Sequence, residues 1–297
     1  MSDTNLIQKV NRTEIIIALL AVYISWGSTY LAIRIALESF PPFFMMGIRF
    51  FVVGVGLYIF LKIKGSATPT LSQWANALLI GSLLFLGGGA GVAYAEQWVA
   101  SGLAALVIAT TPLWTVMFAW IWKHRSSRME WAGLIVGLIG VVLLNLDGDL
   151  RASPLGAFSL IFASIAWSLG SMWSLRLDLP SGMMANAIEM IAGGMLVLVV
   201  SFFSGEKINV IPTLSSIAAI VYLAVFGSLV GFSAYMYLLK RVRPALATSY
   251  AYVNPVIAVI LGIWIAGEQI TEIGITAMVV IIAGVLLVMF GQRKYSV

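Results

Sequence analysis

The sequence predicts an all-α membrane protein of ten transmembrane helices, built as two inverted five-helix repeats with both termini in the cytoplasm. Three observations lead to this prediction. The chain of 297 residues is 61% hydrophobic and only 10% charged, whereas a soluble domain needs about 25% charged residues to cover its surface. Its apolar residues fall into long runs with short polar segments between them. The two halves of the chain also carry matching residues at a nearly constant spacing.

Ten apolar segments follow one another along the chain, and most of the loops between them are shorter than ten residues. Inside lipid, only a helix satisfies its own backbone hydrogen bonds without closing a barrel, so each segment is expected to be helical. The first run has no small-residue cleavage site after it, which indicates an uncleaved first span. The segments are 13–36, 42–61, 73–95, 101–122, 130–146, 154–175, 182–204, 214–238, 244–267 and 273–291.

The basic residues give the orientation, because cytoplasmic loops carry an excess of lysine and arginine. With the N-terminus inside, the outer loops contain only Arg151 and Lys207. Thirteen of the seventeen basic residues then lie in cytoplasmic segments: Lys9, Arg12, Lys62, Lys64, Lys123, Arg125, Arg128, Arg176, Lys240, Arg241, Arg243, Arg293 and Lys294. The net charge of +5 therefore reflects topology and gives no indication of nucleic-acid binding.

The fourth and ninth spans show the duplication most clearly. Pro112 and Pro255 lie 143 residues apart, and so do Ala104 and Ala247. Because five spans are an odd number, residues 151–297 enter the membrane from the side opposite to residues 1–150. Inverted repeats of this kind are typical of alternating-access carriers, whose substrate site lies near the midplane between the halves. Further matches are Trp26 with Trp167, Tyr94 with Tyr237, and Gly140-Val141 with Gly284-Val285.

Two five-helix units, each with a proline-bearing fourth helix and a glycine-rich fifth, resemble the drug/metabolite transporter superfamily, and most closely its EamA-type bacterial exporters. The second half carries the pattern best, through Pro255, Gly267-Glu268 and Gly284. The first half departs from it, because Lys123-His124 stands where Gly-Glu is expected. The resemblance covers nearly the whole chain. It implies export of amino acids, nucleosides, drugs or other metabolites.

The two prolines are expected to kink their helices, since proline removes a backbone hydrogen bond. Pro112 and Pro255 then either serve packing alone or free a carbonyl group that faces the cavity. Thr110, Thr111 and Asn254 stand beside them and can satisfy that carbonyl or reach a ligand.

Glycines cluster at 87–91 in the third span, with a thinner echo at Gly227 and Gly231 in the eighth. Small residues let membrane helices approach closely, so close packing is the favoured interpretation, with a hinge as the alternative. A phosphate-binding loop is excluded, because the context is apolar and no Lys-Ser/Thr pair follows.

Aromatic residues at depth indicate an amphipathic cavity suited to aromatic or apolar metabolites and cations. Each of them either contacts a ligand or serves packing and the lipid surface. Tyr252 belongs to the same group of deep aromatic residues. The predicted substrate-binding residues are Trp26, Tyr30, Tyr94, Trp98, Thr111, Trp114, Trp167, Tyr235, Tyr250 and Asn254.

Charges inside spans are costly unless they face water or a partner, about 2.5–3.5 kcal/mol each on insertion scales. Arg49 in span two and Glu189 in span seven occupy equivalent repeat positions with opposite charge. Glu96 and Lys240 lie near them, on the outer and inner sides respectively. We predict two gates that close alternately, Arg49–Glu96 outside and Glu189–Lys240 inside. The alternative is that each charge bonds to backbone or cavity water.

Enzymatic chemistry is disfavoured by what the sequence lacks. It has no cysteine and one histidine, His124, in a basic loop. A metal site, a cofactor and a catalytic Ser-His pair are therefore not expected.

The sequence thus predicts a multi-pass carrier of the bacterial inner membrane that exports small organic metabolites. Its expected partners are a small-molecule substrate and the lipid bilayer, with protons as a candidate coupling ion and a monomer or weak dimer as the assembly. An uncoupled facilitator is the alternative within transport. A channel or lipid-handling protein is the second class, although no selectivity-filter motif is present.

Overall fold

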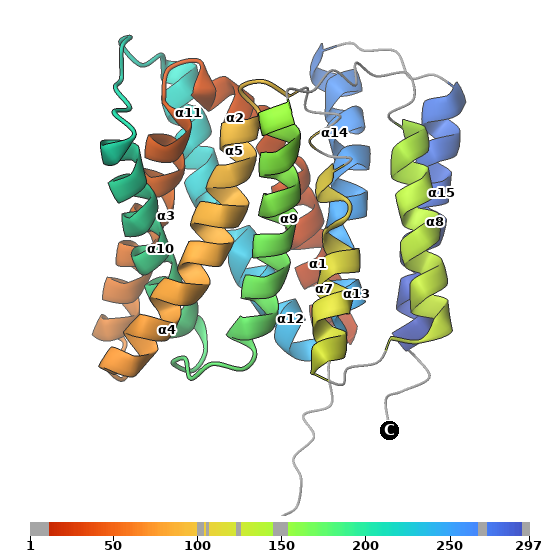
Figure 1. The fold of residues 1–297 in the computed structure, drawn as a ribbon, viewed down its shortest axis with the longest axis horizontal. Helices are drawn as coiled ribbons and strands as arrows, with labels where there is room; N and C mark the ends of the chain where they lie inside the picture. Colours follow the sequence, from red (N-terminus) through yellow and green to blue (C-terminus); the bar gives the residue numbers. More distant parts are fainter. Residues whose placement is uncertain are drawn as a thin grey trace, which may run out of the picture.

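The structure is a computed structural model that describes residues 12–99, 104, 107–122, 126–144, 154–266 and 272–292. The elements of the described chain are helices that run up and down through one bundle (Figure 1). In the first half they are α1 (Arg12–Gly27), α2 (Thr29–Leu37), α3 (Pro42–Ile63), α4 (Leu71–Gly81), the π-helix η1 (Ser82–Ala90), α5 (Gly91–Ala95), α7 (Thr111–Ile121) and α8 (Arg128–Leu144). In the second half they are α9 (Pro154–Ser174), α10 (Met183–Phe203), α11 (Leu214–Tyr222), the π-helix η2 (Leu223–Phe232), α12 (Ser233–Arg241), α13 (Pro244–Ala247), α14 (Tyr250–Ala266) and α15 (Glu272–Gln292).

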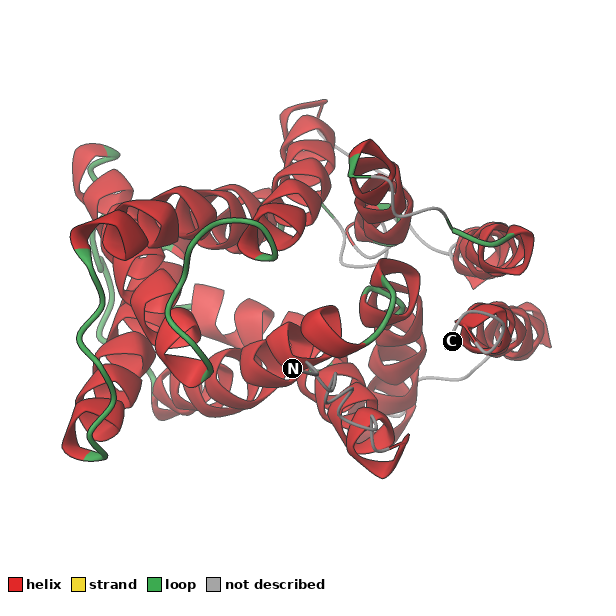
Figure 2. Cartoon of the chain, turned by 90° about the horizontal axis from the view of Figure 1, so that it is seen from below, coloured by secondary structure: helices red, strands yellow, loops and turns green. Residues whose placement is uncertain are grey.

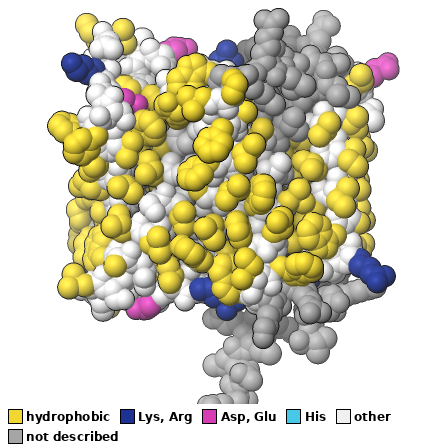
Figure 3. All heavy atoms as spheres, viewed as in Figure 1, with side chains coloured by type: hydrophobic (Ala, Val, Ile, Leu, Met, Phe, Trp, Pro, Cys, Tyr) yellow, Lys and Arg dark blue, Asp and Glu magenta, His cyan; other side chains and the backbone are white. Residues whose placement is uncertain are grey.

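Seven helical runs of the described chain are long and apolar enough to cross a membrane, and α7 is a shorter apolar helix. Apolar side chains cover the visible face between two rims at which charged side chains lie (Figure 3). The prediction of an all-helical membrane protein is therefore confirmed. The count of ten spans and the cytoplasmic termini stay predictions, because parts of the fourth, fifth and ninth segments and both chain ends lie outside the described residues. The seven runs are Arg12–Leu37, Pro42–Ile63, Leu71–Ala95, Pro154–Ser174, Met183–Phe203, Leu214–Arg241 and Glu272–Gly291.

The same local structures end and begin helices in both halves. Gly65 after α3 and Gly205 after α10 have φ angles of 83° and 71°, the left-handed conformation in which glycine commonly ends a helix. Thr70 and Thr213 then cap α4 and α11, each accepting a hydrogen bond from the backbone three residues on. These recurrences agree with the proposed duplication, because helix ends of the same type recur 140 and 143 residues apart.

The most extensive contacts between the halves are those of α3 with α10 and of α8 with α15. They lie toward opposite ends of the long axis of the molecule (Figures 1 and 2). Glycines allow both approaches: a Cβ at Gly54 would lie 2.7 Å from the backbone nitrogen of Ile191, and one at Gly284 would lie 2.5 Å from that of Gly137. Because a real Cβ does not come so close to backbone atoms, these positions require glycine at the observed spacing.

Charged groups also connect the halves near the helix ends. Glu206, in the loop after α10, accepts hydrogen bonds from the backbone N–H groups of Phe43 and Phe44 at the start of α3, at 3.1 and 2.8 Å. At the opposite membrane surface, Arg243 forms a 2.6 Å ion pair with the buried Glu130 of α8. The space between the halves is thus bounded by contacts that involve both repeats.

Pro112 lies in the first turn of α7, which follows a turn at Ala109–Thr110. The span is therefore interrupted before the proline, where the missing N–H of proline costs nothing, instead of being kinked at it. Pro255 is inside α14, as a kinking proline would be, and a separate turn at Thr248–Ser249 interrupts the same span earlier.

Candidate functional site

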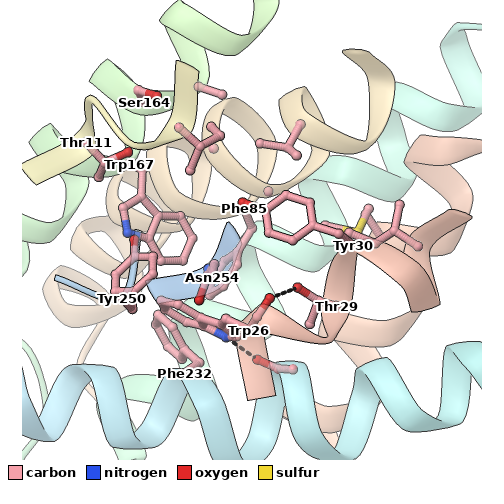
Figure 4. Close-up of a pocket in the computed structure, with 18 of the residues that line it drawn as sticks. Trp26, Thr29, Tyr30, Phe85, Thr111, Ser164, Trp167, Phe232, Tyr250 and Asn254 are labelled. Atoms are coloured by element: carbon pink, nitrogen blue, oxygen red, sulfur yellow. Dashed lines mark hydrogen bonds between the residues drawn. The ribbon is translucent and has the colours of Figure 1, made fainter. Parts of the chain in front are cut away.

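A cavity lies between the two halves, in the part of the molecule where α3 begins and α5 ends. It has a volume of about 730 Å³, including the open space at its edge. Its lining comes from the end of α1, the starts of α2, α5, α7 and α14, the first half of α3, the middle of α9, and both π-helices (Figure 4). The lining residues are Trp26, Thr29, Tyr30, Ile33, Met46, Arg49, Phe50, Phe85, Gly88, Gly89, Val92, Ile108, Thr111, Ala163, Ser164, Trp167, Gly227, Phe232, Tyr250 and Asn254.

Four aromatic rings pack together at one end of this cavity, with Trp26 at their centre. Its ring centroid lies 4.5 Å from that of Tyr250, 5.2 Å from that of Tyr235 and 5.3 Å from that of Trp167. Figure 4 shows Trp26, Trp167 and Tyr250 gathered in this way, with Asn254 beside them. Edge-to-face contacts of this type are favourable beyond the burial of the rings. The four packed rings therefore close one end of the cavity, which we call its floor.

Each of the two tryptophans packs on a glycine of the opposite half. Trp26 lies over Gly231 of η2, where an added Cβ would be 2.5 Å from its Nε1 atom. Trp167 lies over Gly88 of η1, where an added Cβ would be 2.8 Å from its ring. Both glycines belong to π-helices, which often occur at functional sites. The glycine clusters therefore serve close packing, the interpretation favoured by the sequence.

The two indole groups differ in their hydrogen bonds. Trp26 Nε1 donates to the carbonyl oxygen of Gly227 at 2.9 Å. Trp167 Nε1 is buried and has no hydrogen-bond partner among the described residues, although it points toward the hydroxyl groups of Tyr235 and Tyr250. The Trp167 indole thus faces two hydroxyl groups of the aromatic cluster, whereas the Trp26 indole is bonded to the backbone of η2.

Two further polar groups at the cavity also lack a partner within the described chain, the Nη1 atom of Arg49 and the Oδ1 atom of Asn254. Arg49 and Asn254 are only 6% and 2% exposed. The Ser168 hydroxyl donates to the carbonyl of Thr111, a lining residue, at 3.1 Å, which links α9 to the start of α7. Polar atoms from three helices thus converge on an otherwise apolar space, the usual composition of a small-molecule site.

Six of the ten predicted substrate-binding residues line the cavity, and their contact with a substrate stays a prediction. Tyr235 stands behind them in the aromatic cluster and donates to Ser171 at 2.7 Å. The six are Trp26, Tyr30, Thr111, Trp167, Tyr250 and Asn254.

Three of the predicted residues lie away from this cavity. Tyr94 packs between Phe43 and Trp98, with centroids 5.3 and 4.7 Å away, and Trp98 is 46% exposed. Trp114 donates to the Thr110 hydroxyl at 3.1 Å within its own span.

Neither predicted gate forms an ion pair in the conformation that the structure describes. Arg49 donates from Nε to the Ser228 hydroxyl at 3.1 Å, and one carboxylate oxygen of Glu96 has no hydrogen-bond partner in the described part of the chain. Glu189 is fully buried, with Lys240 within electrostatic range and both carboxylate oxygens unbonded there as well. Closure of the gates in other conformations stays a prediction.

Several lining residues were missed from the sequence, above all Phe50, Phe85 and Phe232. Phe85 precedes the glycine run and Phe232 follows Gly231, so a search for aromatic neighbours of small residues would have found them. No group of three or more potential metal-ligating side chains occurs within the described ranges.

Comparison with known proteins gives the family. Residues 13–146 and residues 154–290 each match the EamA-like transporter family. The chain belongs to the EamA-like transporter family. The resemblance seen in the sequence is thereby confirmed, and because the family consists of transporters, so is the expectation that the chain is not an enzyme.

Two relatives and one solved structure resemble the chain over nearly its whole length. It is 47% identical to the "Uncharacterized inner membrane transporter YedA" of Escherichia coli (strain K12) over 94% of this chain and 91% of that protein. A "Probable amino-acid metabolite efflux pump" of the same organism is 23% identical over 96% of this chain and 97% of that protein. One solved crystal structure aligns with a TM-score of 0.77 over 97% of this chain and 100% of the other, at 20% identity, which shows the shared fold.

Proposed function

We propose that this protein exports small organic metabolites across the bacterial inner membrane by alternating access. The location rests on its similarity to the Escherichia coli inner membrane transporter. The export direction is supported by the distant relative named as an efflux pump. Protons are a candidate for coupling, and an uncoupled facilitator is the alternative.

The observation that carries this proposal is the cavity between the two halves. With the orientation predicted from the basic residues, α3 begins and α5 ends at the outer surface, so the cavity lies in the outer half of the membrane. We infer that the aromatic cluster around Trp26 closes the cavity toward the inner half. A solute site closed on one side is the arrangement that an alternating-access carrier requires.

Transport into proteoliposomes tests this function directly. The purified protein is reconstituted, and uptake of labelled amino acids and aromatic cations is measured with and without a pH gradient. We expect uptake of at least one solute that is accelerated by unlabelled solute on the opposite side. Dependence on the pH gradient would assign proton coupling, and its absence would assign facilitated diffusion.

A matched pair of variants connects transport to the cavity. Trp26→Ala removes a ring from the floor of the cavity, whereas Trp120→Ala removes one that is 62% exposed on the outside of the bundle. We expect a loss of several-fold only for Trp26→Ala, since contact with one ring contributes roughly 0.5–2 kcal/mol. Solute flux without acceleration from the opposite side would instead indicate a channel, and absence of solute flux would contradict the proposal.

A further inference from the structure

Arg49 is a buried cation at the wall of the cavity. It lies on α3, is 6% exposed, and is one of the residues that line the space described above. Cations at such depth in a membrane protein are rare and usually functional. The question is what compensates its charge.

The protein supplies only part of that compensation. Nε donates to the Ser228 hydroxyl at 3.1 Å, and the guanidinium carbon lies 4.5 Å from the centroid of the Phe50 ring. Nη1 has no hydrogen-bond partner, and no carboxylate forms an ion pair with Arg49 in the described part of the chain. A hydroxyl group and a ring face leave the positive charge without a counter-ion.

The surroundings of the guanidinium fit a flat apolar group. Phe85 lies between two other rings, with centroids 4.3 Å from Phe50 and 5.0 Å from Phe232. Gly227 leaves the guanidinium room, because a Cβ there would be 3.3 Å from Nη2. The cavity therefore combines one unpaired cation with an aromatic wall.

We propose that Arg49 binds the carboxylate group of an aromatic or similarly apolar organic anion, whose body rests against the rings of Phe85 and Trp26. Arginine suits this role because its fork of N–H donors matches the two oxygens of a carboxylate. This inference rests on the proposed function, since it names the class of solute that the cavity takes.

Direct binding tests this inference without requiring transport. Three probes share one phenyl group: 3-phenylpropionate, 3-phenylpropan-1-ol and phenethylamine. Their dissociation constants for the detergent-solubilised full-length protein are measured by calorimetry at neutral pH. We expect 3-phenylpropionate to bind most tightly. Arg49→Gln should weaken it by about 10- to 100-fold, the usual worth of hydrogen bonds to a charged group, and leave the alcohol unchanged.

Two control variants make the result specific. Arg49→Lys retains the charge without the fork and should retain part of the affinity. Arg34→Gln removes an exposed arginine of α2 that does not line the cavity, and should leave all three affinities unchanged. Unchanged binding of the alcohol to Arg49→Gln shows at the same time that this variant is folded.

Three results would overturn the inference. One is a wild-type protein that binds 3-phenylpropionate no more tightly than the alcohol. Another is an Arg49→Gln variant that binds it as tightly as the wild type. The third is recovery of transport when Glu96→Arg is added to Arg49→Glu, because that would assign Arg49 to the gate. In each case, solute uptake by the wild-type vesicles would leave the proposed function standing.

Discussion

At the scale of single residues, the two tryptophans of the cavity are equivalent in sequence and unequal in bonding. Both pack on a glycine of a π-helix from the opposite half. Trp26 is bonded to the Gly227 carbonyl, while the indole N–H of Trp167 has no partner among the described residues. Trp26 therefore holds the fold together through a bond that Trp167 does not make.

Phenylalanine substitutions separate these roles. Trp26→Phe removes the donor of the bond to the Gly227 carbonyl and should lower the free energy of unfolding by about 0.5–1.5 kcal/mol. Trp167→Phe removes the same atoms without breaking a bond to the backbone, so it serves as the matched control and should be less destabilised. Thermal unfolding in detergent measures both. Equal destabilisation of the two variants would show that the Gly227 bond contributes nothing.

The sequence predicted Trp26, Tyr30, Trp167 and Tyr250 among the aromatic residues that line the cavity, and missed Phe50, Phe85 and Phe232. Trp26 and Trp167 were found because the duplication pairs them. Tyr94 was predicted at the cavity because its span is one of those that the fold places around it. The wider turns of η1 precede it and change the face on which it lies, so it packs on Phe43 instead. A π-helix has no signal in the sequence that would have predicted this shift.

At the scale of helices, glycines decide where the two halves touch. Gly54 and Gly56 occupy the same helix, α3, and differ only in what surrounds them. A Cβ at Gly54 would meet the backbone of α10 at 2.7 Å, whereas a Cβ at Gly56 would meet nothing within 4 Å. The sequence predicted glycine packing in other spans. The contact of α3 with α10 could not be predicted from the sequence, because it joins residues far apart in the chain.

This difference predicts opposite effects of one substitution. Gly54→Ala should separate α3 from α10 and lower the yield of folded protein and its melting temperature. Gly56→Ala should be neutral or stabilising by roughly 0.5–1 kcal/mol, since alanine favours the helix more than glycine does. Fluorescence-detected size-exclusion chromatography with a thermal ramp compares them. Equal stability of both variants would contradict the close approach at Gly54.

The helix breaks were predicted only in part. The prolines at 112 and 255 were visible in the sequence, but the turns at Ala109–Thr110 and Thr248–Ser249 were not. The hydroxyl groups of Thr110, Thr248 and Ser249 donate to backbone carbonyls three or four residues earlier. Tertiary contacts add to these local bonds, as in the 2.7 Å bond between the hydroxyls of Tyr23 and Ser249. Such contacts join residues far apart in the chain.

At the scale of the whole molecule, the distribution of basic residues predicts the topology. A reporter fused after Val297 should report from the cytoplasm, and one inserted at Gly148 should report from the outside, because the odd number of spans per half reverses the second repeat. Both positions lie outside the described residues, so the experiment is independent of the structure. A cytoplasmic signal from the Gly148 insertion would contradict the inverted arrangement.

The two halves have the same order of helices but differ in the size of the side chains at equivalent positions. Tyr235 and Tyr250 of the second half are buried in the aromatic cluster. The residues at the equivalent positions of the first half, 143 residues earlier, are Val92 and Val107. Val92 lines the cavity. Large side chains thus occupy the space on one side of the midplane, and small ones leave it open on the other.

Replacing Tyr250 with valine makes the halves more alike. Because the wild-type sequence contains no cysteine, a single cysteine can be introduced on the inner side and its labelling rate compared in both backgrounds. We expect Tyr250→Val to raise the rate at a buried position of α12, such as Met236, which is 2% exposed. An unchanged rate would show that Tyr250 does not close this side.

Because side chains fill one side of the cavity more than the other, we also expect the half-saturating solute concentration in vesicles to differ between the two membrane faces. If most molecules have their site open to the outer face, only a small fraction can bind solute from the inner face. The apparent affinity measured from the inner face is reduced by that fraction. The half-saturating concentration should therefore be lower from the outer face than from the inner one. For an exporter, cytoplasmic solute must then accumulate before flux begins, so the tyrosines at 235 and 250 would set the concentration at which the cell starts to expel it.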